Sequence, residues 1–350
     1  MLKNLFSHND WANDKLLPLC EGLTDEQLDA DRPMGFGSLR ATLFHMWAAE
    51  RLWLDRWLGK PWAPLNTQAN ISLEQLTADL KSVAAERNEL INVERATNFD
   101  RVVEYKNTEE HTFAHRIGDL LLHVANHATH HRAQALNYLK QFERTVPGGL
   151  DYIFYKLAFP TLEQTPDAIE AMREAGLDTV TGNGLQVEFN VAEIQSYYAY
   201  SDWATDQIVT AATDIDESLL DRDFNMGPGT FRKTLLHTVV AEEWWYRNWT
   251  EDPSEFPSFD EAIPLVEIAE RLARLREQRN ELVSNLDEGS AGRPIPVSFG
   301  TPPISFRVIE SMVQLCSHGT HHRAQLLNML RQFGATTPAI DYVVWMRTND

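Results

Sequence analysis

The sequence is poor in cysteine, in basic residues and in long apolar runs, and each shortage excludes a class of protein. Two cysteines, Cys20 and Cys316, in 350 residues cannot form a disulfide framework or a cysteine-based metal motif. No apolar run approaches the roughly 20 residues that cross a bilayer. The first residues also lack the uninterrupted apolar core of a signal peptide. We therefore expect a protein of the reducing cytoplasm, without a membrane as partner.

Basic residues are also outnumbered by acidic ones. The chain has 31 Lys and Arg against 51 Asp and Glu, which gives a formal net charge of −20. Nucleic acids and anionic lipid surfaces repel such a chain, and no basic stripe offsets the repulsion. We therefore expect no nucleic-acid partner. Hydrophobic residues make up 43% and charged residues 23% of the chain, which is typical of a packed core rather than a disordered chain.

The feature that the sequence does contain is an internal repeat. The triplet DWA at 10–12 recurs 192 residues later at 202–204. The segment HATHHRAQALNYLKQF at 127–142 pairs with HGTHHRAQLLNMLRQF at 318–333, and twelve of these sixteen positions are identical. The offset, now 191, becomes 190 where Asp151-Tyr152 matches Asp341-Tyr342. The chain is therefore a tandem duplication.

The repeat predicts two domains, because 350 residues are comfortable for two cores. We place copy 1 at residues 1–158, a linker at 159–189 and copy 2 at 190–350. Prolines open the linker and glycines close it, and both residue types break regular structure. Its middle, 167–175, favours a short helix.

Apolar residues recur at helical spacing in four segments of each copy. In copy 1 they predict helices over 2–19, 39–57, 73–93 and 117–142. The less regular stretches at 102–113 in copy 1 and 294–306 in copy 2 show partial β alternation, which favours a short hairpin or an extended excursion. The predicted fold class is all-α, with two tandem antiparallel four-helix bundles.

Histidines lie on the inward faces of two of these helices. His127 and His131 are one turn apart on the 117–142 helix, on or beside its apolar stripe. His45 shares a face with Ala41 and Ala48 on the 39–57 helix. Three imidazoles from two facing helices can converge on one ion, and bundle cores are a recurrent place for such sites.

The duplication separates these histidines from the rest. Copy 1 has eight histidines and copy 2 only four, yet copy 2 keeps the counterparts of all three. A lone core histidine would more often be satisfied by hydrogen bonds. Three buried neutral imidazoles, present twice, would be costly without a cation. We therefore predict one divalent metal ion per domain, with these ligands: His45, His127, His131, His237, His318 and His322.

Other repeated residues receive supporting roles. We expect Gln134 and Gln325 to hold the second nitrogen of a ligand histidine. His130 and His321 turn away from the ligand axis, which suits surface or supporting groups. We expect core or structural roles for Trp11, Trp53, Trp57, Arg132, Trp203, Trp245, Trp249 and Arg323, and a cap or hydrogen bond at a helix end for Asp10 and Asp202. Glu50 and Glu242 lie five residues after the histidine of their helix, which turns them off its face.

Three segments together resemble the DinB/YfiT-like superfamily, once per copy. They are DWAND at 10–14, LFHMWAAERLW at 43–53 and HVANHATHHRAQ at 123–134. The last is similar to the motif H-x3-H-R-G-Q, with Ala133 and Ala324 where glycine is usual. The resemblance implies an antiparallel four-helix bundle in each copy, whose three histidines named above hold zinc, nickel or a related divalent ion.

The same resemblance implies a chemistry. Relatives include thiol-dependent S-transferases and a thiol-dependent maleylpyruvate isomerase, so it implies a small-molecule substrate and a low-molecular-weight thiol. Members often dimerise, which implies a homodimer or an intramolecular pseudo-dimer. Three imidazoles leave the ion an open position, the pattern of a catalytic site. A metal-dependent thiol transferase is the leading hypothesis. A metal-dependent hydrolase and a non-catalytic metal-binding or stress-response module stay open, because no residue is an evident general base.

Overall fold

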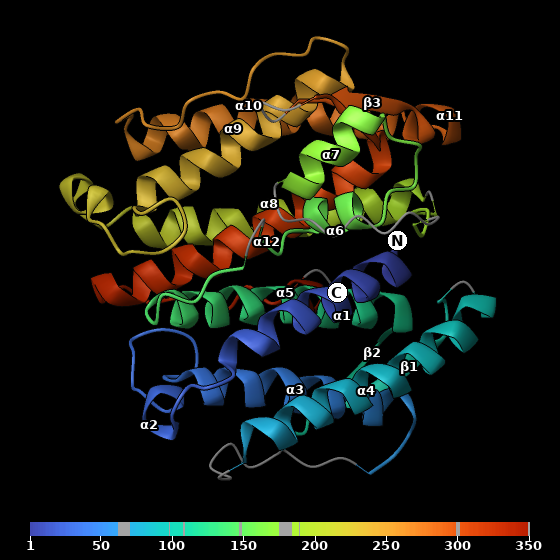
Figure 1. Ribbon diagram of the computed structural model, residues 1–350, viewed down its shortest axis with the longest axis vertical. Coiled ribbons are helices and arrows are strands. Elements are labelled where there is room, and N and C mark those ends of the chain that lie inside the picture. Colours follow the sequence, from blue (N-terminus) through green and yellow to red (C-terminus); the bar gives the residue numbers. More distant parts are fainter. Residues whose placement is uncertain are drawn as a thin grey trace. The chain divides into compact units, whose positions relative to one another are not determined.

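A computed structural model describes residues 1–61, 71–97, 99–107, 109–146, 149–174, 184–188, 190–298 and 302–348 (Figure 1). It is 66% helical, and only small two-stranded sheets accompany the helices. The all-α prediction is therefore confirmed. Among the described helices, none is long and apolar enough to cross a membrane.

The first bundle is built by four long helices, which are α1 (Leu2–Leu16), α3 (Leu39–Trp57), α4 (Leu73–Glu94) and α5 (Ile117–Lys140). Helix α3 packs against α4 and α5, and α5 also packs against α1. Ser38 and Ser72 cap the starts of α3 and α4, where their hydroxyls accept a hydrogen bond from a backbone N–H of the first turn. The packing of α3 on α5 brings two histidine-bearing faces together.

Shorter elements connect these helices, and they are η1 (Leu17–Cys20), α2 (Asp25–Leu28), η2 (Arg95–Thr97), β1 (Val102–Lys106) and β2 (Thr112–Arg116). The predicted first helix gives way to the 3₁₀ turn η1 because Pro18 has no N–H and clashes with the preceding turn. Strands β1 and β2 pair antiparallel, with Val103 opposite His115. The predicted hairpin is therefore confirmed.

The second bundle repeats this plan with α8 (Val191–Ala212), α9 (Phe231–Trp249), α10 (Leu265–Ser284) and α12 (Val308–Phe333). Helix α12 packs against α8 and α9, and α10 packs against the same two helices. Its shorter elements are η3 (Glu217–Asp221), α11 (Glu288–Gly292) and the antiparallel strands β3 (Pro294–Val297) and β4 (Ile304–Arg307).

Two short helices are exchanged between the sequence copies. Contacts divide the chain into one unit of Leu2–Arg144 with Asp341–Asp350 and another of Met1 with Thr145–Ile340. Helix α6 (Tyr152–Ala158) ends copy 1 in the sequence but packs on α12. Helix α13 (Tyr342–Thr348) ends copy 2 but packs on α5. Each bundle is therefore completed by the terminal helix of the other copy.

The sequence repeat and the contacts in the structure therefore divide the chain at different positions. The repeat predicts domains at 1–158 and 190–350, whereas the contacts change unit after Arg144 and after Ile340. Within the linker expected at 159–189, the described part contains helix α7 (Pro166–Glu174), where a short helix was predicted. Residues 175–183 and 189 of that linker lie outside the described residues.

Candidate metal centres

The first histidine triad lies between α3 and α5. The Nε2 atom of His127 is 3.0 Å from Nε2 of His45 and 3.1 Å from Nε2 of His131. One ring nitrogen of each histidine can therefore face a common point. His45 and His127 are partly exposed and His131 is buried, so the triad opens toward solvent on one side.

The second triad has the same construction between α9 and α12. His237, His318 and His322 each offer a ligand atom, and these atoms lie within 4.8 Å of one another, as they do in the first triad. The ring centroid of His322 is 4.8 Å from that of His237 and 4.3 Å from that of His318. The structure therefore brings together all six predicted ligands, in the two predicted groups of three.

The donor set fits a divalent metal ion. Nitrogen ligands at about 2.0–2.1 Å from a tetrahedral ion lie about 3.3 Å from one another, close to the spacing in the first triad. In the second triad the buried Nε2 of His318 has no hydrogen-bond partner in the described part of the chain. A buried nitrogen lone pair without a donor is costly, and a cation would satisfy it.

Burial holds five of the six imidazoles in the neutral form that metal ligands must have, since it lowers the pKa of each. Burial, with repulsion from His131, lowers the pKa of His45 to about 3. Burial lowers the pKa of His131 to about 4, although its bond to Gln134 opposes the shift. Burial and then repulsion from His318 lower the pKa of His237 to about 4. No proton has to be displaced from these rings before an ion binds at neutral pH.

These shifts predict that the metal-free protein loses stability on acidification. The folded pKa of His131 lies near 4 and its ordinary value is 6.5. Between these values the unfolded chain binds the proton and the folded chain does not, so folding is disfavoured as pH falls from 6.5 toward 4. We expect His131 alone to account for on the order of 3 kcal/mol of this loss. Urea unfolding of the metal-free protein at a series of pH values measures it.

The variant His131→Leu is the control, because it removes one titrating imidazole and leaves the carboxylates unchanged. The difference in unfolding free energy between the two proteins isolates His131. A difference that stays constant from pH 6.5 to pH 4 would contradict the prediction.

A glutamine orients one ligand in each triad, as the sequence predicts. Nδ1 of His131 donates to Oε1 of Gln134 at 2.8 Å, and Nδ1 of His322 donates to Oε1 of Gln325 at 2.8 Å. The amide group of each glutamine in turn donates to Nε2 of the preceding histidine, at 3.1 Å for His130 and 3.0 Å for His321. The proton on Nδ1 leaves Nε2 of His131 and His322 free to bind an ion.

Glycines in the turns before α3 and α9 allow the backbone to approach these glutamines. Gly35 and Gly227 have positive φ angles of 49° and 51°. A Cβ atom would lie 3.0 Å from Oε1 of Gln134 at the first position and 2.2 Å from Oε1 of Gln325 at the second. Only glycine suits both the backbone conformation and the space.

Aromatic rings cover the two triads differently. In the first, Phe36 stacks on His45 with ring centroids 3.9 Å apart, and it is 44% exposed. In the second, Phe259 lies against His237 at 4.8 Å and comes from the chain between α9 and α10. The sequence prediction missed these rings, because the repeat does not conserve them.

The C-terminal turn of copy 1 contributes a carboxylate to the second triad. Oδ2 of Asp151 lies 2.8 Å from Nδ1 of His318 and Oδ1 lies 3.8 Å from Nδ1 of His321. Burial alone would raise the pKa of Asp151, but His321 and then His318 hold it well below its ordinary value. Burial raises the pKa of the matching Asp341 to about 6. The sequence repeat shows that Asp151 and Asp341 occupy matching positions, but it does not show that Asp151 contacts the second triad.

A buried ion cluster repeats in both bundles. Arg87, 1% exposed, pairs with Asp10 at 2.5 Å and with Glu50 at 3.1 Å. Arg279, also 1% exposed, pairs with Asp202 and Glu242. Both arginines occur in the repeated segment RNEL, and all three positions recur at an offset of 192, so the repeat held a signal for this cluster.

Comparison with protein-family models shows to which family the chain belongs. The DinB family matches residues 1–166 and again residues 186–349. The chain belongs to the DinB family. The two matches confirm the resemblance and the tandem duplication, and they make this a DinB-family protein with two histidine triads that could bind metal ions. Searches of curated proteins and of solved structures gave no match.

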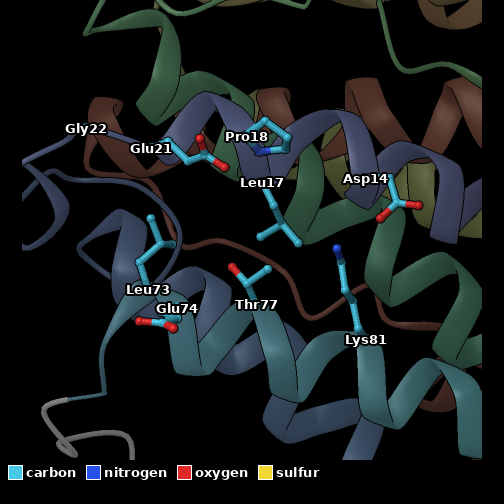
Figure 2. A pocket seen from close by; sticks show the side chains of 9 residues that line it. All are labelled: Asp14, Leu17, Pro18, Glu21, Gly22, Leu73, Glu74, Thr77 and Lys81. Carbon is cyan, nitrogen blue, oxygen red and sulfur yellow. The ribbon is translucent and has the colours of Figure 1, made fainter.

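Of two hollows in this DinB-family chain, one borders a triad histidine and the other does not. A cavity of about 40 Å³ borders His318, and its lining includes Ser201, Glu242 and Arg279. It has room for only one or a few water molecules. A groove of about 410 Å³ between α1 and α4 is lined by nine residues, none of them a triad histidine. Figure 2 shows Asp14 and Lys81 pointing into this groove from opposite helices.

Proposed function

We propose that the protein is a metal-dependent enzyme of the thiol S-transferase type that acts on small molecules. A divalent ion, zinc or nickel, would be held once per bundle, by His45, His127 and His131 and by the second triad. The observation that carries the proposal is the convergence of three imidazoles from two helices, which occurs twice. Membership of the DinB family supports it.

The triads favour a catalytic over a closed structural site. In the described residues, each group of potential ligands has three members, and a structural ion usually takes four protein ligands. His45 and His127 are partly exposed, so a ligand can approach the open side of the first triad. A pure binding module would not need such access.

The thiol would come from outside the chain. Burial raises the pKa of the Cys20 thiol to about 12 and also raises that of Cys316. Neither forms a thiolate near neutral pH, and the thiolate is the nucleophilic form. A small external thiol is therefore required for transfer.

The chain's own residues would orient the ligand histidines and contact the substrate. A bound divalent ion would supply the Lewis acidity that lowers the pKa of a thiol or a water and so provides a nucleophile. Gln134 and Gln325 fix the tautomers of His131 and His322. Phe36 and Phe259 lie over His45 and His237, where an apolar part of a substrate would contact them. Their different positions favour different substrates at the two sites.

Cobalt substitution tests this function. Protein purified without a metal-affinity column is stripped, reloaded with cobalt(II) and titrated with glutathione or L-cysteine. We expect a new near-ultraviolet sulfur-to-cobalt band, and thiol-dependent turnover with a panel of electrophilic halides. The double variant His131→Ala/His322→Ala is the control. Turnover of esters without thiol would favour a hydrolase, and a spectrum unchanged by thiols, without turnover, would favour a binding module.

A further inference from the structure

The second triad carries a chain of polar contacts that links two of its ligands. Nδ1 of His322 donates to Gln325, whose amide donates to Nε2 of His321. His321 must then carry its proton on Nδ1, which faces Oδ1 of Asp151 at 3.8 Å. Oδ2 of the same carboxylate accepts from Nδ1 of His318 at 2.8 Å. The 3.8 Å contact is longer than a hydrogen bond, so the carboxylate of Asp151 bonds His318 and only lies near His321.

The position of Asp151 is set by contacts that do not involve its carboxylate. Asp151 precedes helix α6 but its side chain does not cap that helix. The backbone N–H of Ile153 donates to Oε1 of Gln314 at 2.6 Å. Lys156 pairs with Glu310 at 2.8 Å, and both side chains are 2% exposed. Helix α6 is therefore anchored to α12 independently, and the carboxylate of Asp151 is left to bond His318.

The first triad lacks this arrangement. Asp341 matches Asp151 in the repeat and precedes helix α13. Across the described ranges, its carboxylate takes part in no hydrogen bond or ion pair, whereas that of Asp151 bonds His318. Gln314, which anchors α6, is replaced by His123 at the matching position. The two triads therefore share their ligands but not the carboxylate that supports one of them.

We propose that Asp151 is a positioning residue for the second metal centre, where it holds the proton of His318 on Nδ1 and directs Nε2 at the ion. The proposal rests on the proposed metal-binding function. A carboxylate partner fixes the orientation of an imidazole and raises its basicity, and its loss typically weakens metal binding 10–100-fold. The second centre consequently binds its ion more tightly than the first, although all six ligands are histidines. Copy 1 thereby completes the site of copy 2.

Metal affinity of single-site proteins tests the proposal. In a His131→Ala background only the second centre binds, and in a His322→Ala background only the first. Zinc is titrated against a competing chelator. We expect Asp151→Ala to weaken the second centre about 10–100-fold. The matched control Asp341→Ala should change the affinity of the first centre by less than about 3-fold, since its carboxylate supports no ligand.

A second variant and a spectroscopic measurement distinguish the loss of ligand support from unfolding of the variant. Asp151→Asn keeps an oxygen acceptor for His318 but loses the charge, so we expect an affinity between those of the parent and Asp151→Ala. The visible bands of the cobalt(II) protein should shift in both Asp151 variants and stay unchanged in Asp341→Ala. Equal losses in Asp151→Ala and Asp341→Ala, or an unchanged second centre, would overturn the proposal. A parent chain that binds no zinc would instead overturn the proposed function.

Discussion

Replacement of His131 by alanine is expected to reduce the metal content from two ions per chain to one. Nε2 of His131 lies 3.1 Å from Nε2 of His127, so its removal leaves two ligands and an incomplete site. If a binding free energy of roughly 10–16 kcal/mol is shared among three ligands, the loss is about 4 kcal/mol, or about a thousandfold in affinity. The same loss is expected at the second centre for His322→Ala.

Elemental analysis and competition titration measure this effect in protein prepared without a metal-affinity column. The double variant should bind almost no metal. The matched control is His111→Ala, because His111 is an exposed histidine of copy 1 whose side chain is 68% accessible and lies outside the triad. Two tightly bound ions in His131→Ala would show that the triads are not the metal sites.

The long helices were predictable because the apolar residues that each helix buries recur at helical spacing in the sequence. The range 39–57 was predicted with the bounds that α3 has in the structure, and 73–93 differs by one residue from α4. The histidine triads followed from the same periodicity, which places the histidines inward, and from the duplication, which keeps these three histidines in both copies. The end of α1 was missed because Pro18 stops the helix earlier than its apolar pattern suggests.

The exchange of terminal helices could not be predicted from the repeat. Asp151-Tyr152 and Asp341-Tyr342 are alike in sequence, and either pair could in principle pack on α5 or α12. The choice depends on tertiary contacts such as the buried pair of Lys156 and Glu310. A local pattern contains no information about which of two similar surfaces a short helix will meet, so the support of His318 by Asp151 emerges only from the structure.

The buried ion cluster illustrates a further limit, because periodicity places a side chain inward but does not name its partner. Arg279 is 1% exposed and its guanidinium bonds Asp202 and Glu242, while its face packs 4.2 Å from the ring centre of Tyr198. The buried carboxylate of Glu242 depends on Arg279 for compensation, whereas Asp202 also pairs with Arg276 at 3.0 Å. The recurrence of this set in both bundles indicates that it stabilises the helix packing around each triad.

Replacement of Arg279 by methionine is therefore expected to destabilise the second bundle by about 3–5 kcal/mol. Methionine fills much of the volume but leaves the buried Glu242 without its ion-pair partner, whereas Asp202 keeps Arg276 at 3.0 Å. Burial already raises the pKa of Glu242 despite the opposing charge of Arg279, and the loss of that charge would raise it further. The folded variant then binds a proton that the unfolded chain releases above pH 4.5, so its stability falls as pH rises from 4.5 toward neutrality. Urea unfolding of the variant at pH 5 and pH 7.5 measures both effects.

Two companion variants make this expectation specific to the buried cluster. Arg247→Ala removes a surface arginine that is 46% exposed and pairs with the exposed Asp252, and it should cost no more than about 1 kcal/mol. Arg279→Met/Glu242→Gln removes a buried charge together with its partner, and it should recover most of the lost stability near neutral pH because no excess proton is bound on folding. If Arg279→Met were as stable as Arg247→Ala at pH 7.5, the cluster would contribute nothing to the bundle, and its recurrence would need another cause.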